Sequence, residues 1–230
     1  MSRISAAITA TGAYVPEFVL TNSMLEKMVD TSDEWILTRT GIKERRILKD
    51  EGKGSSFLAI NAAKDLITKN SIDPRSVDLV IVATATPDMK AASTASFTAT
   101  QIGAINAFSF DMDSACSGSL FGMSTAASFI ESGRCRKVLL IGADKMSSIV
   151  NYKDRETCII FGDGAGAALF ERNDEGLGLI DEYLKTDGNG REFLQATYGG
   201  SSYKITPEIL LKGGQFSKML FLIWLTQLPK

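Results

Sequence analysis

Cys116 is the side chain in this sequence whose type and setting are best suited to covalent chemistry. It lies in the segment FDMDSACSGSLFG, residues 110–122, where an apolar strand-like run gives way to small residues and then to a helix pattern. The free backbone N–H groups of a helix N-terminus favour a thiolate, and small neighbours leave room for a substrate to approach the sulfur. Cys116 is therefore a candidate nucleophile. The alternative is a buried structural cysteine, a common environment for an unpaired thiol.

Histidine, the usual partner of a nucleophilic cysteine, is missing from the whole sequence of 230 residues. A histidine base normally activates such a thiol or completes its chemistry. We therefore expect any reaction at Cys116 to depend on the helix N-terminus rather than on a neighbouring base.

Trp35 and Arg39 form a second candidate constellation, within the segment SDEWILTRTGIKERR, residues 32–46. Residues four apart on a helix share one face, so the guanidinium can stack on the indole ring. One interpretation is a surface cation–π pair. The other is a clamp for a planar base, with a guanidinium ready to bind phosphate.

The glycine-rich run FGDGAGA, residues 161–167, is a weak signal for phosphate binding. It lacks both the G-x-G-x-x-G spacing ahead of a clear helix and the lysine of a P-loop. A tight turn, at which two backbones approach closely, explains the glycines equally well. A nucleotide-binding module built on this run stays open as an alternative.

The elements that must position these residues alternate between short apolar strands and helices. Strands are predicted over residues 4–11, 42–48, 77–83, 107–111 and 137–143. Helices are predicted over residues 24–29, 32–41, 55–67, 93–102 and from Cys116 to about residue 133. The run VDLVIVA at 77–83 has the continuous apolar character of a strand buried on both faces. This alternation predicts an α/β fold with a parallel sheet.

The helix ends and the later part of the chain carry further expectations. Thr21 or Asn22, Ser32, and Ser55 or Ser56 are predicted to cap the first three helices. Residues 158–170 are predicted to form two short strands around a glycine-rich turn, and residues 176–188 one further strand.

The charge balance argues against polyanionic partners. Lysine and arginine number 25 against 27 aspartate and glutamate residues, a net charge of −2, so neither nucleic acid nor an acidic membrane surface is an expected partner. The small basic cluster of Lys43, Arg45 and Arg46 is predicted to be a solvated face.

The cysteine pattern and the N-terminus indicate a reducing compartment. The three cysteines, Cys116, Cys135 and Cys158, are odd in number and widely spaced, which argues against a disulfide framework and a metal site. The N-terminal residues are broken by threonine, glycine and proline and predict a strand rather than a signal peptide. We therefore expect a cytoplasmic protein.

Three segments taken together resemble one family. The stretches SDEWILTRTGI, DSACSG and FGDGAGA occur in the order and at separations similar to those of bacterial 3-oxoacyl-[acyl-carrier-protein] synthase III, the initiating condensing enzymes of fatty-acid synthesis. The resemblance covers about residues 4–207. Relatives that make hydroxymethylglutaryl-CoA or polyketides share the cysteine chemistry, but SDEWILTRTGI favours synthase III.

The resemblance implies a thiolase-like, layered αβαβα fold of two similar halves that forms a homodimer. Residues 1–175 would be the first half, with the nucleophile, and residues 176–208 the start of the second half. Residues 209–230 look like an anomalous tail, which suggests a chain that is C-terminally truncated or frameshifted relative to the family.

The resemblance also implies a reaction and a set of site residues. Cys116 would accept an acyl group from acetyl-CoA or another short acyl-CoA, and malonyl-acyl-carrier protein would then lose carbon dioxide and attack the thioester. Trp35 and Arg39 would hold the adenine end of coenzyme A, assisted by Arg155 and Thr31. No cofactor besides the acyl-CoA substrate is implied, and no metal.

The missing histidine departs from the family pattern. In this family a histidine and an asparagine of the second half assist the decarboxylation. We therefore expect this chain to retain the acylation of Cys116 and to lack the condensing half-reaction. The alternative is a catalytically inert remnant, or a half-subunit that pairs with an intact synthase.

Overall fold

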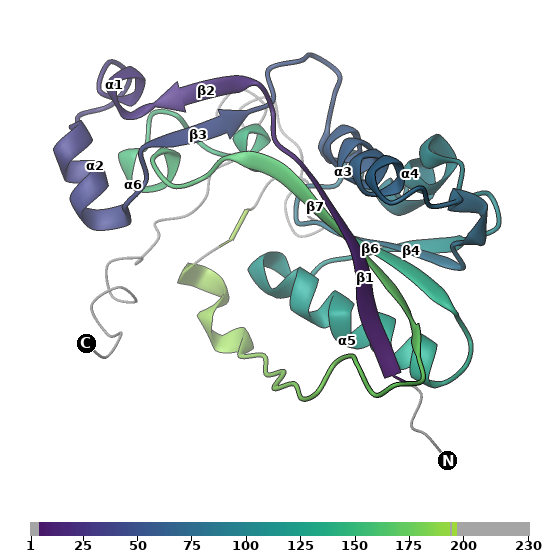
Figure 1. Cartoon of the computed structure of the whole chain (residues 1–230). Helices are drawn as coiled ribbons and strands as arrows, with labels where there is room; N and C mark the ends of the chain where they lie inside the picture. The colour runs from purple at the N-terminus through teal and green to yellow at the C-terminus, as the bar shows by residue number, and fades with distance from the viewer. Residues whose placement is uncertain (1–4, 194, 197–230) are drawn as a thin grey trace. The chain divides into compact units, whose positions relative to one another are not determined.

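The computed structural model describes residues 5–193 and 195–196, with the side chains of 192 and 193 excepted. The described residues form two compact units (Figure 1). The first unit contains the chain up to Pro16, Leu48–Lys145 and Asp163–Leu184. The second unit contains Glu17–Ile47, Met146–Gly162 and the described residues from Lys185 onward. The expected anomalous tail, residues 209–230, and residues 197–208 lie outside the described residues.

The first unit is built on a five-stranded sheet with the strand order β1-β7-β6-β4-β5. Its strands are β1 (Ser5–Tyr14), β4 (Leu79–Ala83), β5 (Phe108–Met112), β6 (Lys137–Lys145) and β7 (Asp163–Asn173). β4 is parallel to both β5 and β6, as the sequence predicts, whereas β7 is antiparallel to β6 and to β1. The sheet is therefore mixed rather than parallel, because the first unit contains no crossover helix between β6 and β7.

Helices cover both faces of this sheet (Figure 1). They are α3 (Ser55–Lys69), α4 (Thr94–Ile102) and α5 (Gly118–Glu131). Val80 and Val82 of β4 pack in one core cluster with α3 and α4, while Leu79 and Ile81 pack in another with α5. All residues of β4 are buried, which explains why this strand reads as a continuous apolar run.

The second unit combines a small antiparallel sheet with short helices. Its elements are β2 (Phe18–Thr21), β3 (Glu44–Ile47), α1 (Asn22–Leu25), α2 (Asp33–Thr40) and α6 (Arg155–Cys158). The predicted caps are confirmed at α1, where Thr21 accepts a backbone hydrogen bond, and at α2, which begins after Ser32 and ends at Gly41 with a φ of 71°. Leu25, Ile36 and Cys158 of α6 share one core cluster.

Four short 3₁₀ turns complete the described chain: η1 (Pro74–Ser76), η2 (Ala115–Ser117), η3 (Met146–Ser148) and η4 (Gly188–Phe193). Within the described residues no helix is both long and apolar enough to cross a membrane.

Three expectations about local structure are wrong. Residues 163–173 form the single strand β7 instead of part of a two-stranded turn, because both of its edges find partners, in β1 and β6. Residues 176–188 contain no strand. Neither Ser55 nor Ser56 caps α3: the cap position is Gly54, and the carboxylate of Asp88 accepts the Ser56 N–H at 2.9 Å.

Candidate functional site

Cys116 lies in η2, between the end of β5 and the start of α5. Its side chain is exposed, whereas Cys135 and Cys158 are buried. Burial raises the pKa of the Cys158 thiol to about 11 and also raises the pKa of the Cys135 thiol. Cys116 is therefore the accessible cysteine of the three, and the alternative of a buried structural thiol is wrong for this position.

The backbone around Cys116 is shaped to present the thiol at a helix N-terminus. Ala115 has a φ of 46°, a left-handed conformation that costs a non-glycine residue about 1–2 kcal/mol. Ser117 occupies the cap position of α5 without a side-chain hydrogen bond to the helix. The Gly118 N–H donates to the Ala115 carbonyl, and no side-chain cap from Ser117 covers the N–H groups that follow it. The start of α5 can therefore stabilise a negative charge that develops at the thiol.

Glycines allow the first turn of α5 to lie directly on the sheet. A Cβ atom at Gly118 would come within 3.2 Å of the Cβ of Ala83 on β4. A Cβ at Gly142 of β6 would come within 2.7 Å of the Ser119 Oγ. These close contacts fix the start of α5, and therefore Cys116, against the carboxyl ends of β4 and β6.

Two aspartates fix the loops at the same edge of the sheet. The Asp144 Oδ1 atom, at the end of β6, accepts the backbone N–H groups of Ala85 at 2.8 Å and Thr86 at 3.1 Å. The Asp111 carboxylate of β5 accepts the N–H groups of Thr94 at 2.8 Å and Ala95 at 2.6 Å and so caps α4. Sequence reasoning missed both aspartates, although each directly ends or follows a predicted strand.

In the second unit, Trp35, Arg39 and Arg155 form one cluster. The Arg39 guanidinium carbon lies 4.3 Å from the Trp35 ring centroid, as the spacing of four residues predicts. The Arg155 guanidinium carbon, from α6, lies 5.0 Å from the same centroid. Arg155 also donates to the Asp30 carbonyl at 2.9 Å. The structure thus brings two cations to one half-buried indole.

Thr31, the fourth residue expected to bind coenzyme A, directly precedes the α2 cap Ser32. Its Oγ1 atom is buried, and among the described residues it has no hydrogen-bond partner. Its role in ligand binding stays a prediction.

Arg45 corrects the expectation of a solvated basic face. Its exposed fraction is 4%, and it donates hydrogen bonds to the Ile159 carbonyl and to the Asn22 side chain. The signal that could have found it is the period-2 alternation of β3, which puts Arg45 on the same face as the buried Ile47.

The glycine-rich run serves close packing. A Cβ at Gly162 would lie 3.2 Å from the Arg46 carbonyl oxygen. The buried carboxylate of Asp163 accepts the Leu48 N–H at 2.8 Å. The run leads into β7, a strand, whereas a phosphate-binding loop of this kind leads into a helix N-terminus. The interpretation as a close approach of backbones is therefore favoured over nucleotide binding.

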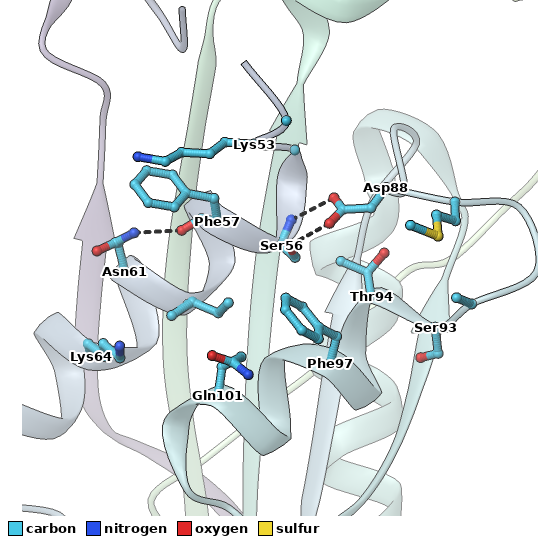
Figure 2. Close-up of a pocket in the computed structure, with 15 residues that line it drawn as sticks. Lys53, Ser56, Phe57, Asn61, Lys64, Asp88, Ser93, Thr94, Phe97 and Gln101 are labelled. Atoms are coloured by element: carbon cyan, nitrogen blue, oxygen red, sulfur yellow. Dashed lines mark hydrogen bonds between the residues drawn. The ribbon is translucent and has the colours of Figure 1, made fainter. Parts of the chain in front are cut away.

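A cavity of about 550 Å³ lies between α3 and α4 in the first unit (Figure 2). Cys116 is not among the residues that line it. Two of its charged groups already have partners: the Lys53 Nζ lies 4.2 Å from the Phe57 ring centroid and 3.4 Å from Asp50, and Asp88 caps α3. In the described part of the chain, no group of histidine, cysteine, aspartate and glutamate residues gathers that could hold a metal ion.

Comparison with known proteins agrees with these features. A family model for 3-oxoacyl-[acyl-carrier-protein (ACP)] synthase III matches residues 110–188, which include Cys116 and the glycine-rich run. The chain is 55% identical over 201 residues to beta-ketoacyl-[acyl-carrier-protein] synthase III 2 of Bacteroides thetaiotaomicron, covering 87% of this chain and 60% of that protein. It is 54% identical over 201 residues to a synthase III of Phocaeicola vulgatus, with the same coverage.

The fold is similar to that of solved members. A beta-ketoacyl-[acyl carrier protein] synthase III structure from Thermus thermophilus superposes with a TM-score of 0.81 at 40% identity, covering 92% of this chain and 63% of that one. The chain thus spans about 60% of the length of the curated relatives that it matches. Sequence, fold and the setting of Cys116 together place the chain in the 3-oxoacyl-[acyl-carrier-protein] synthase III family, with its thiolase-like fold.

Proposed function

We propose that Cys116 accepts an acyl group from acetyl-CoA or another short acyl-CoA. The observation that carries the proposal is an exposed cysteine at the start of α5, whose first N–H groups have no side-chain cap. The Cys116 thiolate attacks the thioester carbonyl, the carbon–sulfur bond to coenzyme A breaks, and the coenzyme A thiolate leaves and takes up a proton. The N–H groups at the start of α5 stabilise the negative charge that develops during the attack. The names of the relatives support this chemistry.

The cluster around Trp35 is proposed to bind the adenine end of coenzyme A. A planar base stacks on an indole, and guanidinium groups bind phosphate in a fixed geometry. Arg39 and Arg155 both lie within cation–π distance of this ring. Thr31 contributes a hydroxyl whose oxygen has no partner among the described residues.

The condensing half-reaction is proposed to need residues that these 230 residues do not supply. In that step malonyl-acyl-carrier protein loses carbon dioxide, and the carbanion attacks the acyl-Cys116 thioester to give a 3-oxoacyl product. Loss of a single oxyanion donor lowers such rates by a factor of about 10² to 10³. The chain contains no histidine to assist the decarboxylation, so we expect acylation without condensation.

We also propose that the chain forms a homodimer through β5. Among the described residues, β5 is an edge strand with one neighbour, β4, and its register with β4 is unbroken. Phe108 at its start is 49% exposed and, with Phe110, packs around Phe129. The other edge, β1, is interrupted by a register shift between Ile8 and Ala10, a device that discourages pairing.

Three unpaired cysteines favour a reducing, cytoplasmic location.

The release of free coenzyme A from acetyl-CoA tests the acylation directly. We expect one rapid equivalent of coenzyme A per wild-type chain, and none from Cys116→Ser. Trp35→Ala should keep the equivalent but need about tenfold more acetyl-CoA to reach it. A burst that survives Cys116→Ser, or its absence from the wild-type protein, would contradict the proposal.

A further inference from the structure

Arg45 is a buried cation that has no carboxylate at its guanidinium among the described residues. Three of its hydrogen bonds end on neutral oxygens: Nε and Nη2 donate to the Ile159 carbonyl, and Nη1 donates to the Asn22 Oδ1. A buried charge is costly, and an apolar residue of similar volume is often equally stable in its place. Fold stability alone therefore gives a weak reason for an arginine at this position.

The hydrogen-bond partners of Arg45 connect it to both helices that carry the Trp35 cluster, α2 and α6. Asn22, 2% exposed, donates through Nδ2 to the Asp33 Oδ1 at 2.7 Å and to the Ile42 carbonyl at 2.9 Å. Asp33 is the first residue of α2, the helix that carries Trp35 and Arg39. The Asn22 amide thus holds both the start of α2 and the chain just beyond its end.

The other partner of Arg45 leads to α6. Ile159 is the C-terminal cap of α6, and Arg155 is the first residue of that helix. Helix ends leave carbonyl groups without helical partners, and the guanidinium satisfies this one from two nitrogens. The guanidinium of Arg155 lies against the Trp35 ring. The contacts of Arg45 therefore connect α6, through Arg155, to the same indole that α2 carries.

We propose that Arg45 and Asn22 are positioning residues that set the distance between α2 and α6, and therefore the geometry of Arg39 and Arg155 around Trp35. The proposal rests on the function proposed above for this cluster, in binding the base and phosphate of coenzyme A. All of its residues belong to the second unit. None of the atoms of Arg45 or Asn22 is required to touch the ligand.

The test uses the full chain labelled with 5-fluorotryptophan, which places fluorine on Trp35 and Trp224. Trp35→Phe assigns the Trp35 resonance. In Arg45→Met and Asn22→Ala we expect this resonance to shift in the ligand-free protein. We also expect coenzyme A to bind about tenfold more weakly, while the rate at which iodoacetamide alkylates Cys116 stays within about twofold of wild type.

Arg46→Met is the matched control, because Arg46 is the neighbouring arginine of β3 and is partly exposed. It should leave both the Trp35 resonance and coenzyme A binding unchanged. Arg45→Lys keeps the charge but loses the two-nitrogen contact with Ile159, so we expect an intermediate shift. Should Arg45→Met fail to fold, Asn22→Ala and Arg45→Lys carry the same prediction.

An unmoved Trp35 resonance in these variants, with coenzyme A affinity equal to that of Arg46→Met, would overturn the inference. A merely structural role would lower the unfolding midpoint without moving that resonance in the folded protein. Failure of the wild-type protein to bind coenzyme A would instead contradict the proposed function. The Trp35 resonance would still decide the role of Arg45.

Discussion

At the scale of single residues, the three cysteines show how one residue type acquires different chemistry from its surroundings. Cys116 is exposed at the N-terminus of α5, whereas Cys135 lies in the core cluster beside α5 and Cys158 in the core of the second unit. Ala115 stores local backbone strain directly before Cys116. Strain of this kind concentrates at sites where a side chain must be presented in one orientation.

Alkylation should separate the three thiols. In the folded protein at neutral pH we expect iodoacetamide to modify Cys116 and to leave Cys135 and Cys158 unmodified, because a buried thiol is neither accessible nor readily ionised. Peptide mapping by mass spectrometry measures the modification. In denaturant all three should react. Equal labelling of Cys158 and Cys116 in the folded protein would contradict the assignment.

The pH dependence of stability should carry the signature of Cys158. Burial raises its thiol pKa to about 11 in the folded protein, from an ordinary 9.0. Between these values the unfolded chain loses the proton and the folded chain keeps it, so the free energy of unfolding falls as pH rises, by up to about 1.4 kcal/mol per pH unit.

Urea unfolding of wild type and Cys158→Ala between about pH 8 and pH 10 isolates this contribution. The other titrating groups are common to both proteins. The difference in unfolding free energy between the two should therefore shrink as pH rises. Parallel pH profiles would show that Cys158 does not titrate differently in the folded and unfolded states.

At the scale of elements, the sequence predicts a helix or strand correctly where its boundaries and burial depend on a single short segment. Ser32 and Gly41 bound α2, and the apolar run at 77–83 contains β4. Both could be predicted because a helix cap and a strand buried on both faces are recognised from residues that are adjacent in sequence. The direction of β7 depends on partners far away in sequence, which periodicity cannot reveal. The burial of Arg45 was missed because composition, rather than strand alternation, guided its interpretation.

The same holds for the candidate site. The position of Cys116 at a strand-to-helix junction could be predicted from its neighbours in sequence. The stacking of Arg39 on Trp35 could be predicted from their spacing of four residues. The network that joins Asn22 to Arg45 spans 23 positions in sequence, and from there it reaches Ile159, so only the fold brings it together.

The packing of β1 on α3 gives a stability prediction at this scale. A Cβ at Gly12 would lie 2.5 Å from both the Ala62 carbonyl oxygen and the Leu66 nitrogen, which are backbone atoms that cannot turn aside. We expect Gly12→Ala to lower the free energy of unfolding by about 2–3 kcal/mol. Chemical denaturation measures the loss.

Gly166→Ala is the matched control, on the neighbouring strand β7 of the same sheet. A Cβ there would meet nothing within 4 Å, and its φ is not in the left-handed region. We expect no loss of stability, because alanine also reduces the conformational freedom of the unfolded chain. A Gly12→Ala protein as stable as Gly166→Ala would contradict the tight contact between β1 and α3.

At the scale of the whole molecule, substitutions on the two edge strands of the five-stranded sheet test which edge forms the proposed dimer interface. We expect Phe108→Glu on β5 to convert a dimer into a monomer, because a charge on an exposed edge strand opposes pairing. Ile8→Glu on β1, at a residue 50% exposed, should leave the dimer intact. Sedimentation velocity distinguishes the two states. Dissociation by Ile8→Glu alone would move the proposed interface to the opposite edge.

The proposed role of Cys116 as an acyl acceptor can be measured by mass spectrometry of the intact protein after mixing with acetyl-CoA. We expect a mass increase of one acetyl group on the wild-type chain, mapped to the peptide that contains Cys116, and none on Cys116→Ser. A wild-type chain that stays unmodified, or an acetyl group that remains on Cys116→Ser, would show that Cys116 is not the acceptor.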